Sequence, residues 1–124
     1  MSVPQSYALI TGIGLAISQC LLKAPERHNI VALGRDEEAL EALGKAYPAQ
    51  VRYISGNISD YVVSAKAVEL ALSCFGQIDA LIINHGQLGK VSTIADTDMS
   101  SFEATMEVNF LSAVACVSGL FTSP

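Results

Sequence analysis

The stretch Tyr7-Ala8-Leu9-Ile10-Thr11-Gly12-Ile13-Gly14-Leu15-Ala16-Ile17-Ser18 decides the fold. Its apolar start favours a buried strand, its two glycines favour a tight turn, and the residues from Leu15 onward favour a helix. At such a turn, backbone N–H groups and the positive end of the helix dipole point to one place, which suits a phosphate group. A turn that needs glycine for its backbone alone is the open alternative.

The strand–turn–helix pattern of the opening stretch recurs along the chain. Short apolar runs alternate with segments of helical periodicity, and Asp36 and Gly76 have the sequence character of a helix cap at the start and at the end, respectively. Ser100 and Glu103 have the spacing of a capping box and predict the start of the last helix, which continues to about Leu120. The predicted strands are 7–11, 29–33, 51–55 and 80–84, and the predicted helices are 14–23, 36–47, 62–75 and 100–120. Strands that alternate with helices predict an α/β fold with a parallel sheet of about four strands and helices on both faces.

The composition limits the classes of partner. The 124 residues suit a single domain, residues 1–124, and a 51% share of hydrophobic residues suits a sheet that is buried on both faces. The net charge of −5 and the absence of a basic cluster argue against binding to nucleic acid or to a membrane surface. The most apolar run, 108–121, is shorter than the roughly 20 residues of a membrane-spanning helix.

The cysteines and the N-terminus bear on the compartment. Three cysteines, Cys20, Cys74 and Cys116, lie in apolar helical patterns and predict buried free thiols in a reducing compartment. The first residues lack the pattern of a secretory signal, and no Cys/His spacing is typical of a metal site. The expected location is therefore the cytoplasm, and no metal is expected.

Candidate site residues follow the predicted strands, at the sheet edge where open α/β folds bind ligands. Arg35 follows the second strand, Asn57 and Ile58 follow the third, and Asn84-His85-Gly86 follows the fourth. Arginine at the first position suits the 2′-phosphate of NADP, whereas an acidic residue there suits the ribose hydroxyls of NAD. The alternatives are a solvated arginine, asparagines that form turns with their own backbone, and a loop histidine without a partner.

Asn109 interrupts an apolar stripe of the last predicted helix. The residues that share its face are Phe102, Met106, Ala113 and Val117. An amide in an apolar stripe needs hydrogen-bond partners. A neighbouring loop or a ligand can provide them, and the spacing leaves both open.

Together these residues resemble the N-terminal half of a short-chain dehydrogenase/reductase. Thr11-Gly12 and Gly14 match the two ends of the family's Thr-Gly-x-x-x-Gly-x-Gly loop, and Asn84-His85-Gly86 matches its Asn-Ala-Gly. Val108-Asn109-Phe110 matches the motif on the family's long helix. The resemblance implies an incomplete, doubly wound Rossmann-type sheet with strand order 3-2-1-4. It also makes Asn109 the counterpart of the family's catalytic asparagine.

The resemblance also implies a nicotinamide cofactor. Its expected contacts are Thr11, Gly12, Ile13, Gly14, Arg35, Asn57, Ile58, Asn84, His85 and Gly86. Asn57 stands where the family usually has an aspartate near the adenine ring, and Arg35 matches the members that prefer NADP to NAD. The expected family activity is therefore NADP(H)-dependent oxidation and reduction of small alcohols and carbonyl compounds.

Two departures from the family pattern change what this chain is expected to do alone. The glycine loop is four residues shorter between Gly12 and Ile13, so fewer backbone N–H groups can surround a pyrophosphate. The chain ends before the family's catalytic Ser and Tyr-x-x-x-Lys, so we expect no turnover without the missing half, which also supplies most of the substrate contacts. Two alternatives remain for the function: a non-catalytic nucleotide-binding or interaction module, and a non-functional truncated product. We also expect a homo-oligomer, formed through the last helix or through the exposed fourth strand.

Overall fold

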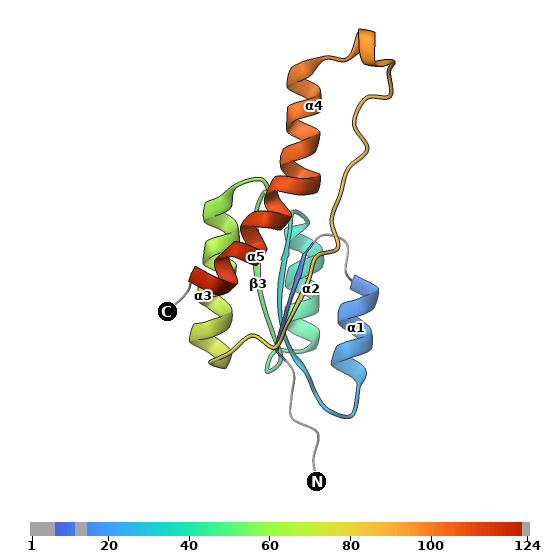
Figure 1. The fold of residues 1–124 in the computed structure, drawn as a ribbon. Helices are drawn as coiled ribbons and strands as arrows, with labels where there is room; N and C mark the ends of the chain where they lie inside the picture. Colours follow the sequence, from blue (N-terminus) through green and yellow to red (C-terminus); the bar gives the residue numbers. More distant parts are fainter. Residues whose placement is uncertain (1–6, 12–14, 123–124) are drawn as a thin grey trace.

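The computed structural model describes residues 7–11 and 15–122, and it describes the side chains of residues 16–120. Four strands form one sheet in the order β3-β2-β1-β4, and every neighbouring pair is parallel (Figure 1). The strands are β1 (Tyr7–Thr11), β2 (Asn29–Gly34), β3 (Val51–Ser55) and β4 (Ala80–Ile82). The predicted α/β class and parallel sheet are confirmed, and the strand order is the expected one.

The helices cover both faces of the sheet. Helices α1 and α2 pack on one face, and α3 and α5 pack on the other, while α4 extends beyond the end of the sheet (Figure 1). The bounds are α1 (Leu15–Lys23), α2 (Glu37–Ala46), α3 (Tyr61–Phe75), the 3₁₀ turn η1 (Ile94–Asp96), α4 (Met99–Met106), the π-helical turn η2 (Glu107–Leu111) and α5 (Ser112–Thr122).

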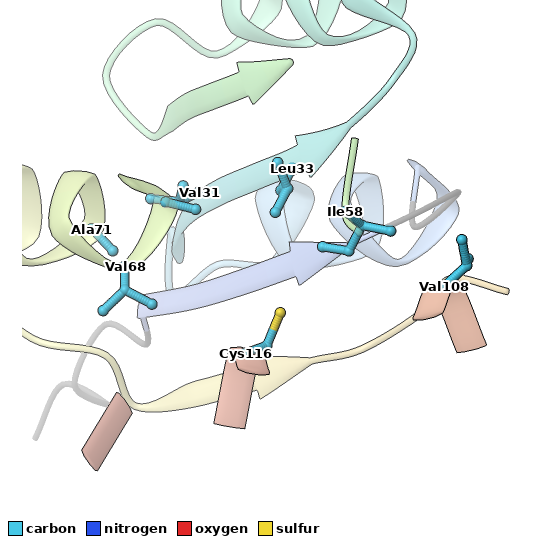
Figure 2. Close-up of a cluster of buried hydrophobic side chains, with 8 residues drawn as sticks. Val31, Leu33, Ile58, Val68, Ala71, Val108 and Cys116 are labelled. Atoms are coloured by element: carbon cyan, nitrogen blue, oxygen red, sulfur yellow. The ribbon is translucent and has the colours of Figure 1, made fainter. Parts of the chain in front are cut away.

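Strand β2 contributes to two separate hydrophobic cores. Ile30 and Ala32 point toward the side of α1 and α2, whereas Val31 and Leu33 point toward α3 and α5. Successive side chains of a strand alternate between the two faces of a sheet, and all four of these are buried. Figure 2 shows the second core, where Cys116 of α5 meets residues of β2 and α3. A strand buried on both faces is what the high hydrophobic content predicted.

The helix caps agree with the sequence at two ends and differ at a third. Asp36 Oδ1 accepts a hydrogen bond from Ala39 N–H, and Gly76 closes α3 with a left-handed φ of 83°. The predicted capping box at Ser100 is wrong, because Asp98 is the N-cap of α4 and its Oδ1 accepts from Ser100 N–H at 3.2 Å. A carboxylate at the positive end of the helix dipole is the stronger cap.

The buried face of the last helical segment is not the apolar stripe that contains Asn109. Val108, Ser112 and Cys116 are buried, whereas the predicted stripe through Asn109 is largely exposed. This segment is apolar on most of its surface, so periodicity alone does not indicate which side meets the sheet. The exposed apolar stripe of α4–α5 consists of Met99, Phe102, Met106, Phe110, Val114 and Val117.

The cysteines are free but not all buried. Cys116 is buried, whereas Cys20 and Cys74 are exposed on α1 and α3. The prediction of buried thiols is therefore wrong for two of the three cysteines. Both helices are rich in apolar residues, so position in an apolar pattern did not separate the core side of each helix from its outer side.

Candidate functional site

The predicted site residues lie at the carboxyl end of the sheet. Thr11 ends β1, Arg35 follows β2, Asn57 follows β3, and Asn84 lies two residues beyond β4. The strands are parallel, so these ends meet at one edge. The predicted contacts at Gly12, Ile13 and Gly14 lie outside the described residues, and nothing is described of the Thr11 side chain.

Arg35 and Asn57 are joined by a hydrogen bond between two strand ends. Arg35 Nη2 donates to Asn57 Oδ1 at 3.0 Å, and the same oxygen accepts from Ser59 N–H at 3.0 Å. The Ser55 hydroxyl donates to the Arg35 carbonyl in a long hydrogen bond of 3.4 Å. Asn57 thus forms a turn with its own backbone, as one alternative proposed, and it also orients the guanidinium. Both side chains are exposed.

The Arg35 guanidinium is suited to an anionic ligand. A guanidinium carries five N–H donors in a planar fork that matches phosphate oxygens. One Arg35 donor engages Asn57 among the contacts of the described residues. The guanidinium is therefore suited to an anionic group next to the ends of β2 and β3.

The side chain of Ile58 lies in the hydrophobic core, although its position after β3 suggested a contact with the cofactor. Its side chain is 8% exposed and belongs to the core cluster with Val31 and Leu33 (Figure 2). A side chain buried there packs against β2 and away from the solvent. Any contact of Ile58 with a ligand would come from its backbone.

Asn109 binds the loop that follows β4. Gln87 N–H donates to Asn109 Oδ1 at 2.7 Å, and Asn109 Nδ2 donates to the Gln87 carbonyl at 2.8 Å. Both the oxygen and the nitrogen of the amide are thereby hydrogen-bonded to the backbone of Gln87. Of the two partners that the spacing left open, a neighbouring loop or a ligand, the structure shows the loop. A Cβ built on Gly86 would lie 3.4 Å from Asn109 Oδ1, which is an ordinary van der Waals contact.

His85 has a partner on the same helical segment. Its Nε2 lies 2.7 Å from Ser112 Oγ, and Ser112 donates to the Val108 carbonyl at 2.5 Å. The alternative of a loop histidine without a partner therefore does not apply. Burial lowers the pKa of the His85 imidazole, and hydrogen bonding to the Val108 backbone opposes this shift in part. The ring is neutral at pH 7, because the net shift moves its pKa below the ordinary value.

Sequence reasoning missed two residues of this arrangement, Gln87 and Ser112. Both are polar residues without a motif of their own, and each meets a partner more than 20 positions away. The sequence carried no signal for them, because their contacts depend on the π-helical turn Glu107–Leu111 around Asn109, and such turns are rare.

The described part of the chain forms neither a metal-binding cluster nor a membrane-spanning helix. No group of three or more His, Cys, Asp or Glu side chains there could hold a metal ion. None of the helices formed by these residues has the length and hydropathy needed to cross a membrane.

The fold and these residues place the chain in a known class. It belongs to the short chain dehydrogenase family, whose model matches residues 8–123. An uncharacterised oxidoreductase of Schizosaccharomyces pombe is 31% identical over 107 residues, which are 86% of this chain and 41% of the relative. The chain thus spans less than half the length of this relative.

Solved structures of the class agree with the fold described here. A short-chain dehydrogenase/reductase from Saccharomyces cerevisiae superimposes with a TM-score of 0.88 at 26% identity, over 94% of this chain and 47% of that one. The L-sorbose reductase of Gluconobacter frateurii, solved with NADPH and L-sorbose, gives a TM-score of 0.78 at 27% identity, over 98% of this chain and 48% of that one. In both comparisons this chain corresponds to about half of the larger protein.

Proposed function

We propose that residues 1–124 form the NADP(H)-binding half of a short-chain oxidoreductase domain that acts on alcohol or carbonyl substrates. The observation that carries the proposal is the Arg35–Asn57 pair, which holds a guanidinium at the carboxyl ends of β2 and β3. NADPH is the nucleotide in the L-sorbose reductase structure, a protein of the same class. The free cysteines suit a reducing compartment such as the cytoplasm.

The proposed contacts divide between the two ends of the cofactor. Arg35, Asn57 and the Ile58 backbone are assigned to the adenosine end, and the loop Asn84-His85-Gly86 is assigned to the nicotinamide end. The turn Thr11–Gly14 is assigned to the pyrophosphate, where its reduced length lowers the number of N–H donors. When bound, the cofactor supplies or accepts the hydride, and the chain's own residues bind and orient it.

Asn109 does not supply acid–base chemistry in this proposal. Both polar atoms of its amide are engaged with the Gln87 backbone, and an amide does not titrate. The proton transfer that carbonyl reduction needs belongs to the Tyr and Lys of the family pattern. No tyrosine of this chain has a lysine four residues later. We therefore assign Asn109 to holding the loop after β4.

Replacing Arg35 tests the proposed nucleotide specificity. We expect the Arg35→Ala variant to bind NADPH about 10–100-fold more weakly, because charge-assisted hydrogen bonds to the 2′-phosphate are lost, and to bind NADH unchanged. Isothermal titration of each nucleotide into the 124-residue chain measures both affinities. The control is Lys45→Ala, which removes the same charge from an exposed ion pair with Glu41 on α2.

Three results would contradict parts of this proposal. If neither nucleotide binds the unmodified chain, the shortened glycine turn has abolished the site. If Arg35→Ala weakens NADH equally, the residue supports the fold and does not read the 2′-phosphate. If the pure chain oxidises NADPH across a panel of carbonyl compounds, the expected lack of turnover is wrong.

A second function is favoured by the exposed apolar stripe of α4–α5. Its Phe102 and Phe110 side chains are 51% and 55% exposed, and Met99 and Val114 are exposed to a similar degree. Exposed apolar surface of this extent marks interaction sites. We therefore propose as the alternative an interaction module that forms homo-oligomers through this stripe.

A further inference from the structure

The helical segment that carries Asn109 changes its hydrogen bonding just before α5. Ser112 N–H donates to the Glu107 carbonyl, five residues earlier, and so passes over the Val108 carbonyl that an α-helix would use. The Ser112 hydroxyl donates to this Val108 carbonyl. The Val108 carbonyl, which receives no hydrogen bond from the Ser112 amide, therefore receives one from the Ser112 hydroxyl. A buried carbonyl needs such a donor.

The direction of the hydrogen bond between His85 and Ser112 follows from counting protons. A serine hydroxyl has one proton, and Ser112 gives it to the Val108 carbonyl. The Ser112 side chain is fully buried, so water does not supply another. His85 Nε2, 2.7 Å from Ser112 Oγ, must then carry the proton of this bond. The chain of donors is His85 Nε2–H to Ser112 Oγ–H to Val108 C=O.

This arrangement attaches the loop after β4 to the helical segment at two points. The side chain of His85 reaches from the loop to Ser112, and the side chain of Asn109 reaches from the helical segment back to the Gln87 backbone. Between the two points lies Gly86. We refer to residues 85, 87, 109 and 112 as the reciprocal clamp.

We propose that His85 is a positioning residue that, through its Nε2–H, fixes the π-helical turn and with it the contact between Asn109 and Gln87. The inference deepens the proposed function, since the clamp sets the shape of the loop assigned to the nicotinamide end. The experiment that tests this inference uses no nucleotide. The inference can therefore fail while the proposed cofactor binding is correct, and the proposed cofactor binding can fail while the inference is correct.

The side chains that replace His85 in the test differ in reach. Alanine, the residue of the resembled motif, offers no donor. Glutamine places an N–H donor three bonds from Cβ, as the histidine Nε2–H does, whereas asparagine places its donor two bonds from Cβ. His85→Gln and His85→Asn are therefore a matched pair that differs in whether the donor reaches Ser112.

Amide hydrogen exchange of Gln87 measures the clamp in the 124-residue chain. We expect exchange at Gln87 to be about tenfold faster in His85→Ala and His85→Asn, because the loop opens more often, and to return to within about threefold of the unmodified rate in His85→Gln. Equal rates in the Gln and Asn variants, or an unchanged rate in the Ala variant, would overturn the proposal.

A second measurement does not depend on whether the His85 variants fold. Long-range ¹H–¹⁵N spectra of the imidazole rings in the unmodified chain report which nitrogen carries the proton. His28 gives the only other ring signal in this sequence, and His28→Gln assigns it. We expect the Nε2–H tautomer for His85. The Nδ1–H tautomer would reverse the direction of the bond to Ser112 and overturn the proposal.

Discussion

Leu33→Ala is expected to lower the free energy of unfolding by about 2–5 kcal/mol, from removed apolar contacts and the cavity left behind. The Leu33 side chain is 1% exposed and packs in the core between β2, α3 and α5 (Figure 2). A domain has about 5–15 kcal/mol in total, so this loss removes a large share of the stability. Urea unfolding followed by circular dichroism measures the change as a lower midpoint at a constant slope.

Leu88→Ala is the matched control for this substitution. It removes the same atoms from a side chain that is 88% exposed in the loop after β4. Its effect should stay within about 0.5 kcal/mol, as for surface substitutions in general. Comparable losses from both variants would mean that Leu33 does not occupy a closed core in solution.

Phe110→Glu is expected to shift the chain from dimers or larger species to monomer. Phe110 lies in the exposed apolar stripe of α4–α5, and a carboxylate buried in a contact between such stripes would be desolvated without a partner. We expect the dissociation constant to rise more than about thirtyfold, as for a central interface residue. Light scattering over a concentration series measures it.

Ala104→Glu is the control for added charge. Ala104 is exposed on α4 but does not belong to the stripe. It should leave the oligomeric state unchanged. A monomeric unmodified chain would remove the basis for the interaction module, and equal dissociation by both variants would point to net charge instead of the stripe.

The sequence predicted the elements whose ends have local causes. Asp36 and Gly76 act within one turn of their own helices, so their residue types were sufficient to place α2 and α3. Strand β2 is a continuous apolar run, and the alternation of strands with helices predicted that its neighbours are parallel, whereas its place in the order β3-β2-β1-β4 was implied by the family resemblance. The start of α4 failed because Asp98 and Ser100 are both good caps two residues apart.

The site was predictable as a location and not as a set of contacts. Residues 35 and 57 were placed by counting from strand ends, since parallel strands bring their carboxyl ends together. The bond between Arg35 and Asn57 needs the register of β2 on β3, which the sequence does not give. The partners of His85 and Asn109 depend on the path of a loop across a π-helical turn, and periodicity carries no information about either.

The burial of β2 on both faces affects how its register in the sheet is specified. In a strand with one polar face, a shift by one residue would expose the apolar set, and burial prevents the shift. Residues 30–33 are apolar on both faces, so burial distinguishes poorly between the correct alignment and its neighbour.

Hydrogen bonds at the two ends of β2 must therefore maintain its alignment. Gln50 accepts from Ile30 N–H at its backbone and donates through Nε2 to the His28 carbonyl, and Gly56 N–H donates to the Gly34 carbonyl. Because burial gives β2 little preference for one register, the hydrogen bonds at its two ends keep it in the observed register. Gln50, the last residue before β3, thus makes two of the hydrogen bonds that fix the start of β2 next to β3.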